Sequence, residues 1–225
     1  MIGERILFST NHLAIQSGVV ALTGRNGAGK STFIKTLLGQ HEQYSGEILF
    51  DGISNRKIAR DQLAKKISVV LSKPELFGDY RVIDVLLLGR IPYLNIAAIP
   101  QKPDVDKVHE IAGLLKISEY LQRKFHSLSD GEKQMVMIGR ALVQDTPYIV
   151  MDEPAAFLDV VNRYEIHALL RQIALRTDKI IITSTHHIER LEQDADVLLL
   201  IAEQEMKLYN QPSEFSAIVK NAFGI

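Results

Sequence analysis

Short apolar runs alternate with longer helical patterns along most of the chain. Five runs are continuous rather than alternating in polarity, are rich in β-branched residues, and are bounded by polar residues or glycine: 19–23, 67–71, 148–151, 180–185 and 197–201. Such runs are typical of strands that are buried on both faces of a sheet. Helix-length stretches lie between them, for example 30–38, 131–143 and 163–176. This alternation predicts an α/β fold with a mainly parallel sheet.

The stretch from residue 73 to residue 140 has a different pattern. It contains several helical patterns, no clear core strand and four of the seven prolines, namely Pro74, Pro92, Pro100 and Pro103. Proline lacks a backbone donor and is rare in central strands. We therefore expect a single domain over residues 1–225, in which 1–72 and 141–225 form the sheet core and 73–140 form an inserted helical subdomain.

The composition excludes several classes of protein. A chain of 225 residues with 46% hydrophobic and 24% charged residues resembles an average soluble domain, not a disordered tail, a collagen or a coiled coil. The net charge of -1 provides no overall basic field for nucleic acid. The absence of cysteine excludes a disulfide scaffold, a thiol nucleophile and a Cys-ligated zinc site. No apolar run reaches the length of a membrane span, which is about 18 residues, so we expect any membrane association to require a partner.

A glycine-rich loop joins the first predicted strand to the first predicted helix. It matches the pattern G-x-x-x-x-G-K-[S/T] in Gly24, Arg25, Asn26, Gly27, Ala28, Gly29, Lys30, Ser31 and Thr32. Glycines let the backbone approach phosphate oxygens closely, and N–H groups at a helix start bind anions. We expect Lys30 to neutralise the β- and γ-phosphates and the Ser31 hydroxyl to bind Mg²⁺. A glycine-rich turn that merely caps a helix is an alternative that the strand–loop–helix context disfavours.

The predicted strand 148–151 ends in two carboxylates, Asp152 and Glu153. Ligands of open α/β sheets bind at the carboxyl ends of strands. We expect Asp152 to hold Mg²⁺ through water, as the equivalent acid does in other nucleotide hydrolases with this loop. Glu153 follows directly and could orient or deprotonate the attacking water. A strand that ends in solvated acids is the alternative, and the phosphate loop upstream favours the functional interpretation.

A second motif narrows the family. It consists of Leu128, Ser129, Asp130, Gly131, Glu132, Lys133 and Gln134. Ser129 followed three residues later by Glu132 predicts a capping box at a helix start, which by itself is common. The segment also resembles the LSGGQ-type signature of ATP-binding-cassette (ABC) ATPases. That resemblance implies a helix N-terminus that points at the γ-phosphate of an ATP held by a partner subunit.

The resemblance to ABC ATPases extends over essentially the whole chain. It implies an ABC ATPase fold, with a RecA-like P-loop core and an inserted helical subdomain, and it implies ATP and Mg²⁺ as cofactors. Residues 156–159 resemble the D-loop of the family, so that Asp159 is expected at a dimer seam. His186 fits the switch histidine that contacts the γ-phosphate. His187 follows it, but a metal site formed by this pair is disfavoured because adjacent strand side chains face opposite ways.

Two positions depart from the family pattern. Ser72 stands where the Q-loop glutamine is expected, and its side chain is too short to copy the reach of glutamine. Family members also carry an aromatic residue that stacks on adenine, nearly 30 positions before the loop lysine, and here Ile2 falls near that position. We therefore expect weak discrimination between ATP and GTP.

The segment 77–93, which ends in Gly89, Arg90, Ile91, Pro92 and Tyr93, resembles the importer ATPases for iron chelates, haem and vitamin B12. An amphipathic helix that ends at a proline is the simpler interpretation. The resemblance implies a head-to-tail homodimer, transmembrane permease subunits that dock on this segment, and indirectly a substrate-binding protein. It places the chain in the cytoplasm, on the cytoplasmic face of the inner (cell) membrane, with no nucleic-acid partner.

Three alternatives share some or all of these motifs. The first is an ABC exporter or a soluble ATPase of the iron–sulfur-assembly type, which differs only in its partner. The second is a nucleic-acid-associated ABC ATPase, which the charge balance and the single cassette disfavour. The third, prompted by Ser72 and the missing aromatic residue, is an ATP-gated module that does not hydrolyse ATP.

Overall fold

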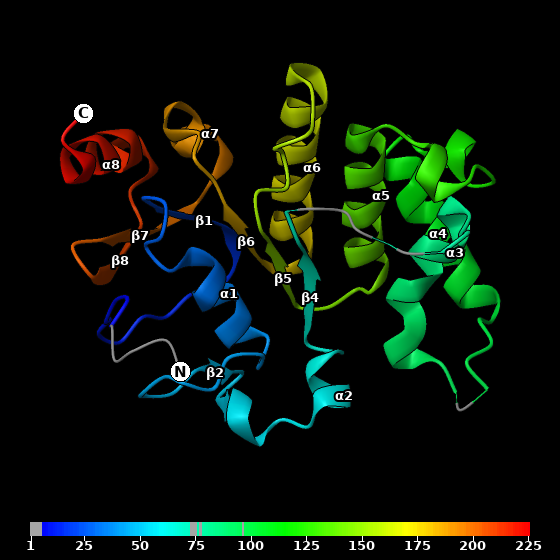
Figure 1. Ribbon diagram of the computed structural model, residues 1–225, viewed down its shortest axis with the longest axis horizontal. Helices are drawn as coiled ribbons and strands as arrows, with labels where there is room; N and C mark the ends of the chain where they lie inside the picture. Colours follow the sequence, from blue (N-terminus) through cyan, green and yellow to red (C-terminus); the bar gives the residue numbers. More distant parts are fainter. Residues whose placement is uncertain (1–5, 73–75, 77, 96) are drawn as a thin grey trace.

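The computed structural model describes residues 6–72, 76, 78–95 and 97–225, and a six-stranded sheet lies at its centre (Figure 1). The strands are β1 (Gly18–Gly24), β4 (Ile67–Val70), β5 (Tyr148–Met151), β6 (Ile180–Ser184), β7 (Val197–Ala202) and β8 (Glu205–Tyr209). Their order is β4-β5-β6-β1-β7-β8, and β8 alone is antiparallel to its neighbour. The prediction of an α/β fold with a mainly parallel sheet is confirmed.

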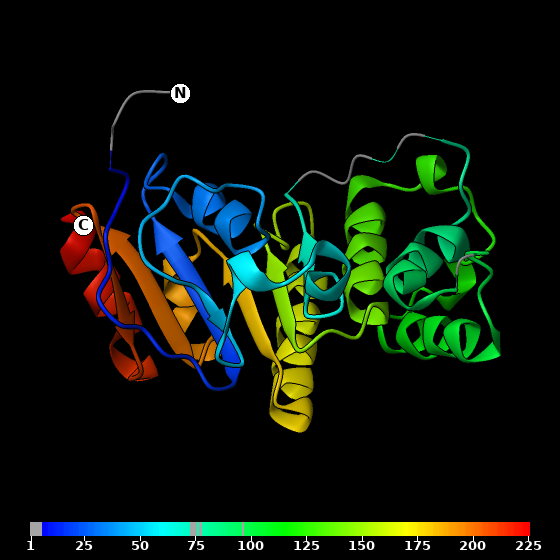
Figure 2. The ribbon, with the colours of Figure 1, turned by 90° about the horizontal axis from the view of Figure 1, so that it is seen from below.

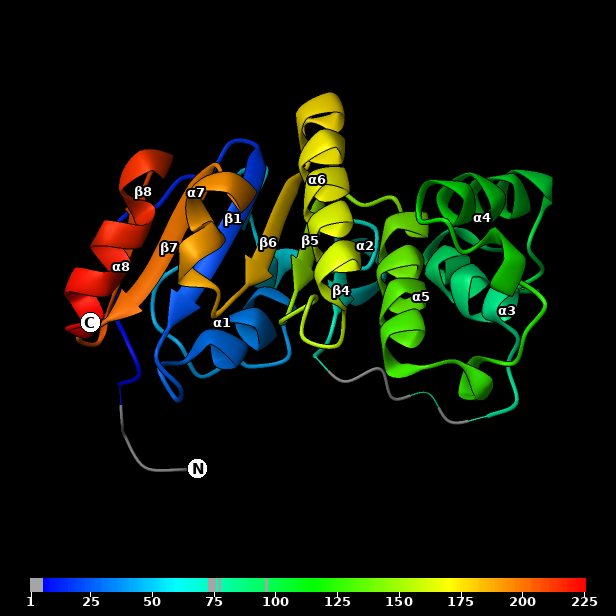
Figure 3. The same cartoon turned by 90° about the horizontal axis from the view of Figure 1, so that it is seen from above.

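Helices cover both faces of the sheet. On one face lies α1 (Lys30–Leu37), whose Ile34 packs in the same cluster as Val20 and Leu22 of β1. The other face carries α6 (Val160–Thr177), α7 (Leu191–Asp194) and α8 (Phe215–Phe223), which lie in front of the sheet in Figure 3. There Ala21 of β1 packs with residues of α7 and α8. Because alternate β1 residues enter opposite cores, the strand is apolar throughout.

Smaller elements close the ends of the sheet. A hairpin of β2 (Leu49–Phe50) and β3 (Ile53–Ser54) leads into the short α2 (Arg60–Leu63), on the α1 side of the sheet (Figure 2).

At the outer strand, the N–H of Ser9 donates to the carbonyl of Gln204, and the N–H of Met206 donates to the carbonyl of Ser9, both at 2.8 Å. The segment around Ser9 therefore satisfies part of the outer edge of β8.

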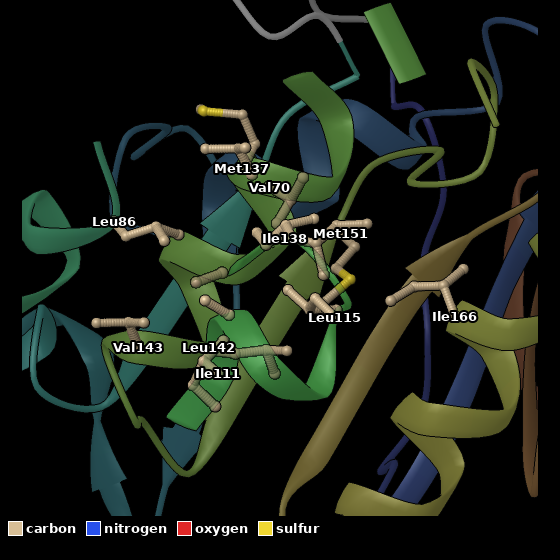
Figure 4. Close-up of a cluster of buried hydrophobic side chains, with 14 of the residues drawn as sticks. Val70, Leu86, Ile111, Leu115, Met137, Ile138, Leu142, Val143, Met151 and Ile166 are labelled. Atoms are coloured by element: carbon tan, nitrogen blue, oxygen red, sulfur yellow. The ribbon is translucent and has the colours of Figure 1, made fainter. Parts of the chain in front are cut away.

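A helical layer extends beyond the opposite edge, next to β4. It contains α3 (Val82–Leu87), α4 (Lys102–Leu114) and α5 (Asp130–Val143), and among the described residues between 76 and 143 none joins the six-stranded sheet. One apolar cluster joins this layer to the sheet, because Leu86 and Ile138 pack with Val70 and Met151 (Figure 4). The helix α5 runs through the expected subdomain boundary at residue 140 and ends at Val143.

In the described part of the chain, every helix is too short or too polar to cross a bilayer.

Candidate active site

A cleft of about 320 Å³ opens at the carboxyl ends of the parallel strands. Its walls come from the glycine-rich loop, from the residues that follow β4, β5 and β6, and from one residue of the N-terminal segment. The lining residues are Leu7, Asn26, Gly27, Gly29, Lys30, Ser31, Thr32, Ser72, Asp152, Glu153 and His186. Residues predicted from four separate parts of the sequence therefore meet in one place.

The glycine-rich loop connects β1 to α1 with two residues in the left-handed region. Gly27 has φ = 77° and Gly29 has φ = 109°. A Cβ atom on Gly29 would lie 3.0 Å from the ring of Phe8, so glycine is required there both for the backbone angle and for the close approach. The helix begins at Lys30, directly after this turn, and its first three residues line the cleft.

The side chain of Lys30 bonds back to the start of the glycine-rich loop. Its Nζ atom donates to the carbonyl of Gly24 at 2.8 Å, and only 8% of the residue is exposed. Burial lowers the pKa of Lys30, while the carboxylates of Glu153 and Asp152 oppose that shift. A partly desolvated ammonium group beside a nest of N–H groups is an arrangement that a phosphate group stabilises.

The acidic residues after β5 are held by a residue that the sequence analysis did not single out. Ser184, the last residue of β6, donates to Asp152 Oδ1 at 2.5 Å and accepts the N–H of Glu153 at 2.8 Å. Ser31 donates to the other Asp152 oxygen at 3.3 Å. A hydroxyl and a carboxylate so close together are oxygen donors of the kind that Mg²⁺ prefers. A buried serine inside an apolar run belongs to no motif. Its role is visible only in the structure, where β6 lies next to β5.

The side chains of Glu153 and His186 contact each other in the cleft. His186 Nε2 lies 2.7 Å from Glu153 Oε1, and both side chains remain partly exposed. Glu153 has φ = 49°, which is unusual for a residue with a side chain. The strain is offset by the bond from its N–H to Ser184 and by the pair with His186. The geometry suits a carboxylate whose orientation is set by two neighbours.

Three other positions named in the sequence analysis have three different outcomes in the structure. Ser72 lines the cleft. Ile2 lies outside the described residues. The side chain of Arg25 leaves the cleft, because its Nη2 atom donates to the carbonyl of Phe223 and its guanidinium lies 5.6 Å from the ring of that residue. Arg25 can therefore contribute to the cleft through its backbone, while its side chain ties the loop to the end of α8.

The signature segment forms the start of α5 as the capping box predicts. Ser129 Oγ accepts the N–H of Glu132 at 3.3 Å, and Glu132 accepts the N–H of Ser129 at 2.7 Å. These bonds lower the pKa of Glu132. A Cβ on Gly131 would lie 3.0 Å from the carbonyl of Phe157, so the signature turn abuts residues 156–159. Among the described residues, no signature residue lines the cleft of its own chain.

Asp159 also lies outside the cleft lining. Its carboxylate caps α6, because Oδ1 accepts the N–H of Asn162 and Oδ2 accepts the amide of the same residue, both at 2.8 Å. His187 uses its N–H for a local bond to Thr185 Oγ1 at 3.1 Å. In the described part of the chain, no cluster of three or more His, Cys, Asp or Glu side chains is arranged to hold a metal ion.

A family model described as ABC transporter matches residues 10–156, a span that includes the loop, the signature and the acidic strand end. The chain belongs to the ABC transporter family. It is thus an ABC ATPase, an enzyme that couples ATP hydrolysis to transport, and the resemblance seen in its sequence motifs is confirmed.

Relatives of this ABC ATPase serve more than one cargo. It is 31% identical over 217 residues to the hemin import ATP-binding protein of Thermobifida fusca. The match covers 94% of this chain and 74% of that protein. It is 29% identical over 208 residues to the molybdate import ATP-binding protein of Haemophilus influenzae, with coverages of 91% and 76%. A solved metal-chelate type ABC transporter in an inward-facing conformation matches with a TM-score of 0.78 and 25% identity, over 94% of this chain and 80% of that one.

Proposed function

We propose that this ABC ATPase powers an importer for a metal chelate such as an iron siderophore, haem or a cobalamin-like compound. The support is the resemblance of segment 77–93 to that group, the hemin import relative, and the likeness to a metal-chelate type transporter. The molybdate import relative favours a second candidate cargo, a small oxyanion. In both cases the ATPase supplies the energy, and other chains select the cargo.

The contact between Glu153 and His186 is the observation on which the proposed mechanism of ATP hydrolysis rests. Lys30 and the loop N–H groups would bind the phosphates of ATP, and Ser31 and Asp152 would hold Mg²⁺, which supplies charge neutralisation at the phosphates when bound. Glu153 would then accept a proton from the attacking water. His186, 2.7 Å away, would hold the carboxylate and face the γ-phosphate.

Glu153→Gln tests this assignment, because the amide keeps the shape of the side chain but cannot accept the proton. We expect turnover to fall by about a hundredfold or more while ATP binding persists. The measurement is phosphate release at saturating ATP, together with nucleotide binding by the same sample. Glu47→Gln, at an exposed position just before β2, is the matched control and should keep normal turnover.

We further propose a head-to-tail homodimer, and the position of the signature supports it. The signature turn does not line the cleft of its own chain, so its exposed helix start is available to a cleft in a second copy. In light scattering, Glu153→Gln with ATP should give a dimer that dissociates when nucleotide is removed. Adding Lys30→Ala to the same variant should keep it monomeric, and a monomer in both cases would count against an autonomous dimer.

The permease is proposed to dock on the outside of the helical layer. Within residues 89–93, Ile91 and Tyr93 expose 55% and 38% of their surface, whereas Arg90 is turned inward to Asp104. We expect a polytopic membrane protein to copurify with this chain from detergent-solubilised native membranes. The chain would dock on the cytoplasmic face of that protein. Its binding protein would then identify the cargo by its bound ligand. Recovery of soluble partners only would support the assembly-type alternative.

A further inference from the structure

One arginine links the segment after the cleft histidine to the helix that follows residue 159. Arg190 ends the short turn Ile188–Arg190. Its guanidinium lies over the ring of Tyr164 on α6, with Cζ 3.8 Å from the ring centroid. Its Nε and Nη2 atoms donate to the two carboxylate oxygens of Asp194 at 2.9 and 2.7 Å. The two-point bond and the stacked ring together fix both the plane and the position of the guanidinium.

The ion pair within this link is largely shielded from water. The side chains of Arg190 and Asp194 are only 17% and 15% exposed, so their attraction is screened far less than that of a surface pair. His167, one turn after Tyr164 on α6, places Nδ1 3.8 Å from the same carboxylate. Burial lowers the pKa of His167 and favours its neutral form, which leaves Arg190 as the cation that pairs with Asp194. Two residues on successive turns of α6 therefore contact this ion pair, Tyr164 at Arg190 and His167 at Asp194.

One end of the link leads to the cleft histidine, and the other leads to Asp159, which the sequence analysis expects at a dimer seam. On one side, the N–H of Ile188 donates to the carbonyl of His186 at 3.1 Å, and the N–H of Arg190 donates to the carbonyl of His187 at 3.3 Å, so the turn is tight. On the other side, α6 begins at its cap Asp159. The start of α6 is further tied to the preceding loop, because Arg163 Nη2 donates to the carbonyl of Leu158 at 3.2 Å.

We propose that Arg190, seated on Tyr164, is a positioning residue that keeps His186 against Glu153 and makes that contact depend on where α6 lies. A second subunit that engages the loop before Asp159 would then act on the proposed catalytic pair through α6, Tyr164 and Arg190. This inference rests on the proposed roles of Glu153 and His186. It assigns to this chain a route by which dimer contact is sensed at the cleft.

Tyr164 offers the cleanest test, because it lies on the surface with 53% of its area exposed and can be changed at little cost to folding. We expect Tyr164→Leu to lower kcat by about fivefold with little change in the KM for ATP, since the phosphate loop is untouched. Tyr164→Phe keeps the ring under the guanidinium and should restore kcat to within about twofold of the native value. Arg190→Gln should lower kcat further than Tyr164→Leu.

Arg171→Gln is the matched control. Arg171 is also on α6 and also bridges to the region after β6, through Asp196 at 2.9 Å and the carbonyl of Gln193 at 2.7 Å, but neither bond involves the carboxylate of Asp194 or the turn at residues 188–190. It should change thermal stability without changing kcat. The imidazole ¹⁵N signals of His186 provide a second readout, because in Arg190→Gln they should move toward those of a histidine without a carboxylate partner, and in Arg171→Gln they should not.

The inference is overturned if Tyr164→Leu and Arg190→Gln keep native kcat and native His186 signals. It is also overturned if Arg190→Gln and Arg171→Gln lose activity equally, in proportion to lost stability. Failure of the proposed function is a separate outcome, since it would appear as undiminished turnover in Glu153→Gln. If that variant is inactive while Arg190→Gln and Tyr164→Leu are normal, only the positioning role is rejected.

Discussion

Ser184 holds two residues of the cleft with one hydroxyl group, since it donates to Asp152 and accepts from the N–H of Glu153. Ser184→Ala removes both bonds and leaves the left-handed backbone of Glu153 without its support. We predict that kcat falls by about tenfold or more, which kinetics at saturating ATP will measure. Ser68→Ala, at an equally buried serine on β4 that bonds Thr146, is the control and should retain native turnover.

Ser72 lines the cleft, and the sequence resemblance predicts a glutamine at this position. The serine side chain is short, so water can fill the space that a glutamine would occupy. We predict that Ser72→Gln changes the hydrolysis rate by about two- to fivefold, and not by orders of magnitude. Equal rates within error, measured by phosphate release, would show that position 72 does not contribute to the site.

Residues within motifs could be predicted from the sequence because each motif joins a backbone requirement to a chemical group. Gly29, Lys30 and Glu153 are of this kind, and all three line the cleft. Leu7 and Ser184 could not be predicted, because neither belongs to a pattern and both reach the site through strand pairing or chain crossing. The side chain of Arg25 also eluded prediction, since its partner Phe223 lies at the other end of the chain.

Among the elements, the turn at Leu88–Tyr93 shows how a motif residue can have an internal role. A Cβ on Gly89 would lie 2.4 Å from the carbonyl of Arg140 in α5, which is backbone and cannot move aside cheaply. We predict that Gly89→Ala destabilises the protein by about 1–3 kcal/mol in urea unfolding. Gly113→Ala, in the last turn of α4 where a Cβ meets nothing within 4 Å, should instead be neutral or stabilising by up to about 1 kcal/mol.

The predicted boundaries agree best with the structure for strands that are buried on both faces of the sheet. For other elements the sequence prediction was less complete. The five continuous apolar runs all became strands, and β5 has the predicted bounds. The strand β8 was missed because it lies at the edge and alternates, with Met206 buried and Glu205 and Lys207 exposed. The helix α6 begins at Val160 rather than residue 163, because Asp159 provides the cap.

At the scale of the whole molecule, several carboxylates stabilise the fold only when charged. A backbone N–H bond from Gln101 and the ion pair with Arg90 lower the pKa of Asp104, and bonds from Lys66 and Tyr148 lower that of Asp51. A lowered pKa means that the folded state binds the proton less well than the unfolded state. The stabilisation is therefore complete above the unfolded pKa of about 4 and is lost as the pH falls through the folded values.

We predict that the urea midpoint declines progressively below about pH 4, and that Asp104→Asn weakens this decline. The comparison requires unfolding curves at several pH values for both proteins. Asp106→Asn, on the exposed face of the same helix, is the control and should leave the pH dependence as it is. An identical decline in all three proteins would assign the acid sensitivity to other carboxylates.

The position of β1 in the sheet has a consequence for how the protein is made. Val20 pairs with Ile182 on one side and with Val197 on the other, so both neighbours of the strand are synthesised long after it. The turn that is to receive phosphate emerges first from the ribosome but has no lateral support until β6 and β7 have followed it. Such long-range pairing delays folding. Competence to bind nucleotide should therefore appear late during synthesis, in one step, when the last parallel strand is complete.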